Sequence, residues 1–190
     1  AEVQGERARK VSTRAAYGTW VHELPKANPS RLQWRWRLDQ PLSGGQGVAD
    51  ILTKAGDDAA LKLCVMFDHP LNSVPFVERT LLRIARSLSG EDLPAATLCY
   101  VWDSVYKAGL HGANPHTQRV RFITLQGKGA PLAQWLTESR DVGADFASLF
   151  SDELPAGAAV PKVRAVLIGA DSDNTGAESL AWVQSVSWTR

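Results

Sequence analysis

The stretch Arg31-Leu32-Gln33-Trp34-Arg35-Trp36-Arg37-Leu38 decides the fold class. Apolar and polar residues alternate along it, so the leucines and tryptophans share one face and the arginines share the other with Gln33. An amphipathic helix needs apolar spacings of three and four, which this stretch lacks. Turn-forming residues follow directly, from Asp39 to Gly45. We therefore predict a half-buried β-strand.

Further apolar runs on either side of this strand also have strand character, and Gly, Pro, Asn and Asp separate them. These runs are residues 61–67, 98–102, 120–125, 134–138, 163–168 and 182–188. Many short strands joined by turns are typical of β-sandwiches and barrels. The sequence predicts an all-β fold, a two-sheet β-sandwich similar to a jelly roll.

One segment, residues 76–88, has helical periodicity instead. Its apolar stripe consists of Val77, Leu81, Ile84, Ala85 and Leu88. Ser73 or Pro75 before it and Gly90 after it suit the ends of a helix. We expect one packed amphipathic helix that covers a sheet edge or the bottom of the sandwich, with its arginines on a solvated face. A second short helix is expected near residues 145–150.

Length and charge limit the classes of function. The chain has 190 residues, with 21 Lys and Arg against 20 Asp and Glu, for a net charge of +1. We expect one domain at 17–190 after an N-terminal extension at 1–16. The balanced charge gives no reason to expect nucleic acid or an anionic membrane as the main partner. No apolar run is long enough to predict a membrane span.

The two cysteines, Cys64 and Cys99, both lie in predicted strands. Two buried thiols are the favoured interpretation. A disulfide is the alternative, and it requires the two strands to be neighbours.

An acidic turn follows the strand that ends near Ile168. Its sequence is Asp171-Ser172-Asp173-Asn174-Thr175-Gly176. Hard cations prefer several oxygen ligands, so Asp171, Asp173 and Asn174 form a candidate calcium site. A turn held by Asx hydrogen bonds is the competing interpretation.

A second acidic segment, Lys54-Ala55-Gly56-Asp57-Asp58, precedes the strand at 61–67. Paired carboxylates can act as a general acid and base. They can also bind calcium or form a solvated turn. Asp57 and Asp58 are therefore candidate site residues.

The seven tryptophans suggest a sugar-binding surface, because indole rings stack on the apolar faces of sugars. Trp34 and Trp36 are predicted to be core residues, since the opposite face carries arginine. Trp102 ends its strand, so a ligand role remains open for it. His111 and His116 lie in a loop without metal-site spacing. No motif for a serine nucleophile or a phosphate-binding loop is present.

Several segments together resemble one bacterial, mostly exported family, the domain of unknown function number three thousand and forty-seven. The acidic segments at 54–58 and 171–176 form the most specific pair of matches. The others are Trp34-x-Trp36, Val65-Met66-Phe67, the run 98–102, Asn114-Pro115, Trp135, Ala144-Asp145-Phe146 and Phe150. The resemblance extends from about Tyr17 onward, but Gln184-Ser185-Val186 stands where the family pattern has an acidic residue.

This resemblance implies an exported protein, periplasmic or secreted, and a sandwich similar by analogy to carbohydrate-binding modules. We expect it to bind a glycan or a related polar ligand. The candidate ligand-binding residues are Lys54, Asp57, Asp58, Tyr100, Trp102 and Arg121.

The alternative is a polysaccharide-cleaving enzyme. A lyase would use Tyr100, His111 or Lys54 as base and Arg121 to neutralise a carboxylate. A hydrolase would use two carboxylates from the acidic segments. A third interpretation is a structural domain, or one that binds a protein partner through exposed aromatic residues.

Overall fold

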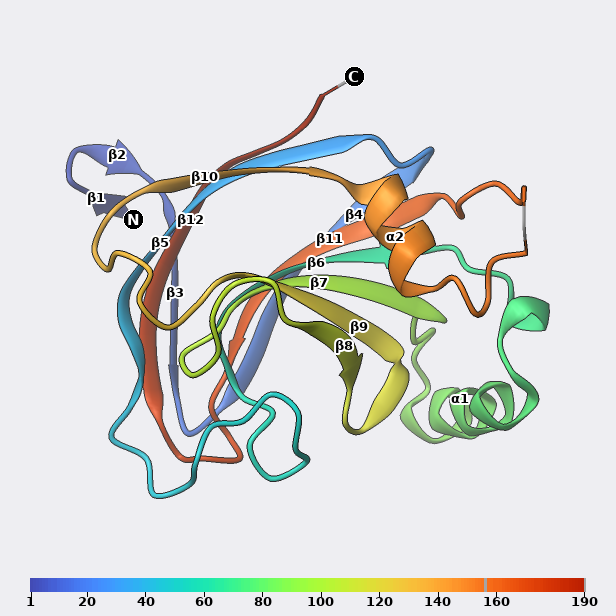
Figure 1. Ribbon diagram of the computed structural model, residues 1–190, viewed down its shortest axis with the longest axis horizontal. Coiled ribbons are helices and arrows are strands. Elements are labelled where there is room, and N and C mark those ends of the chain that lie inside the picture. The colour runs from blue at the N-terminus through green and yellow to red at the C-terminus, as the bar shows by residue number, and fades with distance from the viewer. Residues whose placement is uncertain (156, 190) are drawn as a thin grey trace.

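Two β-sheets face each other across one hydrophobic core (Figure 1). The strand order is β10-β5-β12-β3 in the smaller sheet and β4-β11-β6-β7-β9-β8 in the larger one. The computed structural model describes residues 1–155 and 157–189, so the last residue of the predicted domain lies outside the described residues. The predicted all-β, two-sheet sandwich is confirmed.

The elements have the following bounds. The four-stranded sheet contains β3 (Arg9–Arg14), β5 (Arg31–Ser43), β10 (Leu136–Asp141) and β12 (Glu178–Thr189). The six-stranded sheet contains β4 (Tyr17–Ala27), β6 (Ala59–Phe67), β7 (Ala96–Trp102), β8 (His111–Asn114), β9 (Thr117–Gln126) and β11 (Val163–Asp171). A small hairpin joins β1 (Glu2–Val3) to β2 (Glu6–Arg7). The helices are α1 (Phe76–Ser89) and α2 (Val142–Leu149), with a short 3-10 turn at Leu71–Ser73.

Most strand pairs are antiparallel, but β7 and β9 run parallel. The chain leaves β7 through a long loop, forms the edge strand β8, and returns as β9 between β8 and β7. In the part of the chain that the structure describes, no helix is long and apolar enough to cross a membrane.

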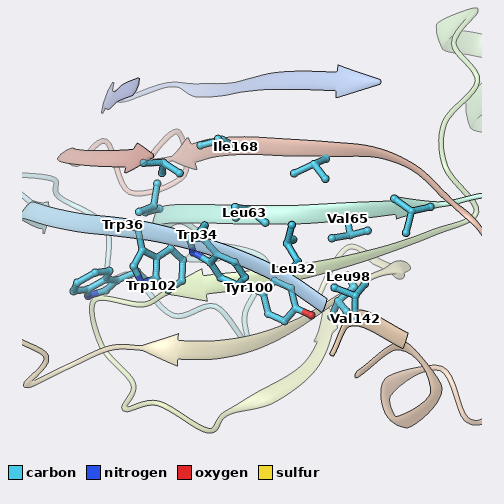
Figure 2. Close-up of a cluster of buried hydrophobic side chains, with 14 of the residues drawn as sticks. Leu32, Trp34, Trp36, Leu63, Val65, Leu98, Tyr100, Trp102, Val142 and Ile168 are labelled. Atoms are coloured by element: carbon cyan, nitrogen blue, oxygen red, sulfur yellow. The ribbon is translucent and has the colours of Figure 1, made fainter. Parts of the chain in front are cut away.

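The core consists of aromatic and aliphatic side chains from the facing surfaces of both sheets (Figure 2). Trp34 and Trp36 of β5 are buried, as the alternation predicts, and their rings contact those of Tyr100 and Trp102 on β7 at centroid distances of 5.2 and 5.5 Å. Tyr100 and Trp102 are only 0% and 1% exposed. This burial excludes the predicted stacking of either ring on a ligand, because no sugar can reach them.

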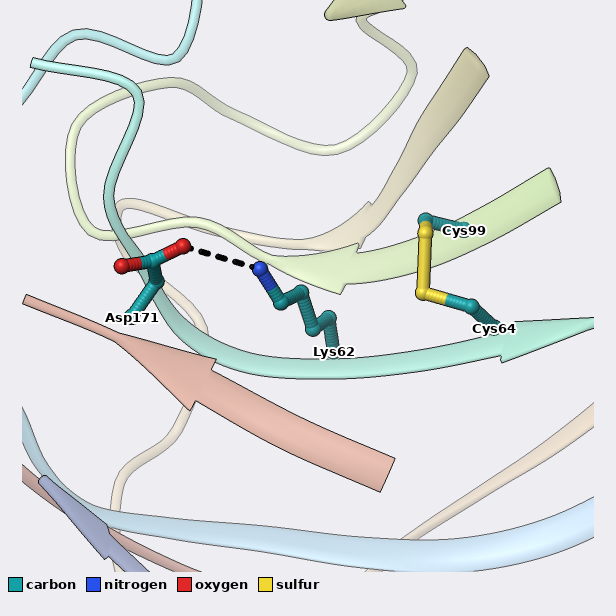
Figure 3. Close-up of a disulfide and its surroundings, with 4 residues drawn as sticks. All are labelled: Lys62, Cys64, Cys99 and Asp171. Atoms are coloured by element: carbon teal, nitrogen blue, oxygen red, sulfur yellow. Dashed lines mark hydrogen bonds and ion pairs between the residues drawn. A yellow bond between two sulfur atoms is a disulfide. The ribbon is translucent and has the colours of Figure 1, made fainter. Parts of the chain in front are cut away.

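A second apolar cluster covers the outer face of the larger sheet, where Ile51 from the preceding loop packs over Leu167 and Phe122. Cys64 and Cys99 belong to it and form a disulfide across β6 and β7 (Figure 3). The two residues are direct partners in the strand register. The favoured interpretation of two free thiols is therefore wrong, and its alternative is confirmed.

Helix α1 occupies the predicted segment, but it packs with a different side. Leu82 is its buried residue, whereas Val77, Leu81, Ile84 and Leu88 of the predicted stripe are exposed. Pro75 stands at the N-cap position without a side-chain cap, and Gly90 ends the helix in the left-handed conformation. The predicted packed helix is therefore confirmed, but the predicted apolar stripe is not the side that packs on the sandwich.

The N-terminal residues belong to the sandwich rather than to a separate extension. Strand β3 pairs with β12 along its whole length, from Arg9 opposite Val183 to Arg14 opposite Glu178. Glu6 of β2 accepts hydrogen bonds from Arg35 (2.7 Å) and Gln184 (2.6 Å), which tie the β1–β2 hairpin to the smaller sheet.

Candidate functional site

The two acidic segments predicted from the sequence meet at one end of the larger sheet. The backbone and hydroxyl of Thr175 donate hydrogen bonds to Oδ2 of Asp58, at 2.9 and 2.5 Å. Asp57 accepts hydrogen bonds from the side-chain amides of Asn174 (2.6 Å) and Asn114 (2.9 Å). The Asp57–Asp58 pair thus fixes the turn at 171–176, as an Asx-type arrangement would.

Three carboxylates gather at this junction. One oxygen from each of Asp58, Asp171 and Asp173 lies within 4.8 Å of the others. Lys62, on the outward face of β6, donates to Oδ2 of Asp171 at 3.0 Å (Figure 3), and its ammonium lies 4.8 Å from the ring centroid of Tyr17. The cluster therefore combines three acids with one cation.

Asp171 is the least satisfied of the three acids. Its Oδ1 is buried and has no hydrogen-bond partner among the described residues. Burial raises the pKa of Asp171, and the charges of Asp173 and Asp58 raise it further, while Lys62 acts in the opposite direction. A cation at Oδ1 would supply the missing partner and offset the repulsion between the carboxylates.

The remaining residues predicted for this site have other positions. Lys54 is exposed on the loop, and its carbonyl oxygen lies 3.2 Å from Nε2 of His116. The side chain of Asn174 is engaged with Asp57, so Asp58 takes the place predicted for Asn174 beside Asp171 and Asp173. Lys62 was missed, although the alternation of Leu61-Lys62-Leu63 places it on the outward face.

Arg121 belongs to a buried ion-pair cluster instead of a ligand site. Its guanidinium contacts Glu153 at 2.8 Å and Asp152 at 2.5 Å, and it packs against the ring of Phe150. Arg119 also contacts Glu153, at 2.5 Å. With 8% exposure and two carboxylate partners, Arg121 is not available to bind a ligand carboxylate as predicted.

The residues expected for a lyase are not assembled into one site. Tyr100 donates to Asp145 at 2.8 Å inside the core, and burial, followed by the charge of Asp145, raises the pKa of its phenol. A buried phenol with a raised pKa is a poor general base at neutral pH. His111 is exposed on β8, while Lys54 lies on the loop before β6.

A hollow lies between the edge strands of the two sheets, β3 and β4. Its volume is about 990 Å³, and its walls come from the N-terminal hairpin, β3, β4, β11 and the middle of β12. A second hollow of about 320 Å³ shares Lys10, Trp20 and Ile168 with it and extends to Tyr17. Together they form what we call the edge groove.

The edge groove is basic and aromatic. Arg7, Arg9 and Lys10 line it and form no ion pair within 4.0 Å in residues 1–155 and 157–189. Trp20 is 42% exposed. The guanidinium of Arg9 lies 3.7 Å from the Trp20 ring centroid, and the His22 ring stacks on Trp20 at 5.8 Å. Packing on an indole orients a guanidinium while leaving its N–H groups free.

The wall of the edge groove that β12 forms is irregular. The pairing of β12 with β5 shifts between Gln184 and Ser187, and Ser185 has a φ of 54°, in the left-handed region. Such bulges recur beside binding sites because they redirect side chains. Here Gln184 and Ser185 both line the groove.

Sequence reasoning missed the edge groove because it set residues 1–16 apart. The available signal was the alternation of Trp20 and His22 in β4, which places both rings on one face of a strand. Nothing in the sequence indicates that β3 and β4 are edge strands of different sheets, with a space between them.

Comparison with known proteins gives a family but no function. No curated protein and no solved structure matches the chain significantly. The family described as "Protein of unknown function (DUF3047)" matches residues 1–187. The match spans nearly the whole chain, including the N-terminal hairpin and both sheets up to the last two residues of β12, and the chain therefore belongs to the DUF3047 family.

Proposed function

We propose that the protein binds an acidic glycan, such as a uronate-containing polysaccharide, in the edge groove. The observation that carries this proposal is Arg9 stacked on the exposed ring of Trp20 inside a hollow of about 990 Å³. A guanidinium held in this way is suited to bidentate contact with a carboxylate. Lys10 and Arg7 add positive charge beside it, and Gln184 adds polar groups.

The shape of the edge groove supports a chain-like ligand. The two hollows share Lys10 and Trp20 and continue along β4 as far as Tyr17, which is 59% exposed. An extended glycan has hydroxyls and apolar ring faces at regular intervals, so it can use both aromatic residues and several basic ones. In this proposal the residues of the edge groove replace Tyr100, Trp102 and Arg121 as the recognition residues, while the expected ligand is still a glycan.

Replacing Arg9 by glutamine is expected to weaken binding of oligogalacturonate by about tenfold or more, because hydrogen bonds to charged groups contribute roughly 1.5–3 kcal/mol. Titration calorimetry with oligogalacturonate, and with a neutral xylo-oligosaccharide of equal length, measures the effect. The wild-type protein should prefer the uronate ligand, and added salt should weaken that preference.

The matched control is Arg83→Gln, an arginine-to-glutamine change on the exposed side of α1, which should bind oligogalacturonate as the wild type does. Equal affinity of the wild type for the acidic and neutral ligands would refute the proposal, as would unchanged binding by Arg9→Gln. Mass spectrometry of the same mixtures detects cleavage, and an unsaturated chain end would identify a lyase.

We also propose that the cluster of Asp58, Asp171 and Asp173 binds calcium, because Oδ1 of Asp171 is buried without a partner beside two other carboxylates. Saturating calcium should raise the melting temperature by a few degrees, since a ligand that binds only the folded state stabilises it. Asp173→Asn removes an exposed ligand and should abolish this rise. Identical melting of the wild type in calcium and in chelator would rule out the site.

The Cys64–Cys99 disulfide supports a further part of the proposal, that the protein functions in the periplasm or outside the cell. Structural disulfides persist mainly in oxidising compartments. Fractionation of the bacterium that produces the protein, with an antibody against it, tests this location; recovery in the cytoplasmic fraction alone would contradict it.

A further inference from the structure

Helix α1 exposes most of its large apolar side chains. Phe76, Val77, Leu81, Ile84 and Leu88 are between 52% and 84% exposed. Four of them, at positions 77, 81, 84 and 88, follow the spacing of one helical stripe. The helix is anchored to the sandwich by a different side, through Leu82, which packs with Val74 and Ala95. Concentration of so much exposed apolar surface on one helix marks an interaction site.

The acidic and basic residues of α1 lie on different sides of the helix. Its single acidic residue, Glu78, turns toward the sandwich and lies 3.5 Å from Arg119. Arg83 is exposed and forms no ion pair within the described residues, and Arg79 lies over the ring of Phe76. Arg86 contacts Asp92 and the carbonyl of Leu93 at the end of the helix. The outward surface of α1 is therefore apolar and positively charged, without an acid.

This combination does not suit pairing with a second copy. The outward charges of α1 are those of Arg79 and Arg83, and its single acid, Glu78, faces Arg119 of the sandwich. A second copy would bring the same positive charge and no outward acid of α1 to pair with it. The partner that fits must accept apolar side chains and carry negative charge.

We propose that α1 is an interfacial helix that docks the protein on the surface of an anionic phospholipid bilayer. A helix with a sharply separated apolar stripe, a modest overall hydrophobicity and arginines on its polar side lies in the plane of the bilayer interface. The stripe enters the boundary of the acyl chains, and Arg79 and Arg83 contact lipid phosphates. The overall charge of +1 does not predict this partner, because the relevant charges are local to one helix.

The position of α1 leaves the proposed glycan site free. Figure 1 shows α1 at one corner of the molecule and the β1–β2 hairpin, which forms a wall of the edge groove, at the opposite corner. A protein held to a bilayer through α1 can therefore present the edge groove away from the lipid. The docking proposal does not depend on the glycan proposal.

Co-sedimentation with lipid vesicles tests the proposal. The wild-type protein should bind vesicles of phosphatidylcholine mixed with phosphatidylglycerol at low salt, and it should bind pure phosphatidylcholine vesicles and high-salt samples more weakly. The double variant Ile84→Ser/Leu88→Ser should lose at least tenfold in affinity, because it removes apolar groups that enter the bilayer. Arg83→Gln should weaken binding to the anionic vesicles by about fivefold.

Two controls separate docking from unfolding and from general charge. Ser87→Ala changes the polar side of the same helix, and Arg9→Gln removes a distant arginine; both should bind vesicles as the wild type does. Because the altered stripe residues are exposed, thermal melting followed by circular dichroism should be nearly unchanged in every variant. A melt that drops sharply for Ile84→Ser/Leu88→Ser would instead show that the stripe is structural and overturn the proposal.

Other outcomes also decide the question. Absence of wild-type binding to anionic vesicles at low salt would overturn the proposal and favour a protein partner for α1. A dimer in analytical ultracentrifugation that becomes monomeric in Ile84→Ser/Leu88→Ser would overturn it in favour of a second copy. The docking proposal is supported if the wild type binds anionic vesicles selectively and if the stripe variant and the Arg83 variant both weaken this binding.

Discussion

Replacing Glu153 by alanine is expected to lower the free energy of unfolding by about 3–5 kcal/mol, because it removes the buried carboxylate that Arg119 and Arg121 share. The carboxylate accepts hydrogen bonds from Arg119 at 2.5 and 2.8 Å and from Arg121 at 2.8 Å. It also lies 3.2 Å from Nε2 of His69. The Glu153 side chain is 0% exposed, so water cannot replace it as a partner for the arginines. Urea denaturation measures the change.

The matched control is Asp68→Ala, which removes a carboxylate from an exposed pair with Lys26. Exposed ion pairs contribute roughly 0–1 kcal/mol, so this variant should lose little stability. A loss of less than about 1 kcal/mol for Glu153→Ala would mean that the buried cluster does not hold β9 to the segment after α2.

Glu153 also predicts a specific pH dependence of stability. Hydrogen bonds from Arg119 and His69, together with the charges of the two arginines, outweigh the effect of burial and lower the pKa of Glu153 from 4.5 to about 2. A carboxyl group whose pKa is lower in the folded state contributes stability above its unfolded pKa. That contribution falls between pH 4.5 and about 2 as the group becomes protonated. This part of the acid destabilisation should be absent from Glu153→Ala.

The fold was predictable where one residue pattern determines the face of a strand. Leu32, Trp34, Trp36 and Leu38 alternate with polar residues, and all four are buried. The helix at residues 76–88 was also predictable, because the spacing of its apolar residues is a local pattern in the sequence. The side on which it packs was not, because the sequence shows an apolar stripe without showing whether the protein or another partner covers it.

The candidate sites depend on contacts between distant segments. Asp57 and Asp58 were predicted as site residues, but their partners in the acidic turn, Asn174 for Asp57 and Thr175 for Asp58, each lie 117 positions further along the chain. The edge groove depends on the placement of β3 and β4 in different sheets. Tyr100 and Trp102 were misassigned because alternation distinguishes the two faces of a strand without identifying which one faces the other sheet.

Removing the disulfide by replacing both cysteines with alanine is expected to cost about 4 kcal/mol of stability. The bond joins residues separated by 35 positions, and closing a loop of that size restricts the unfolded chain by about this amount in the chain-entropy model. Cys64 and Cys99 are 1% and 5% exposed, so the variant also loses packing in the outer apolar cluster. Urea denaturation of the wild type and of Cys64→Ala/Cys99→Ala measures the loss.

Reductant distinguishes the effect of the bond from that of packing. Dithiothreitol should lower the stability of the wild type and leave that of the double alanine variant unchanged, because only the wild type has a bond to reduce. The β6–β7 register holds Cys64 opposite Cys99 whether or not the bond is present, so the reduced protein should still fold into the same sandwich with a lower melting temperature. Equal stability of the wild type with and without reductant, measured after unfolding and refolding, would show that the bond does not constrain the unfolded chain.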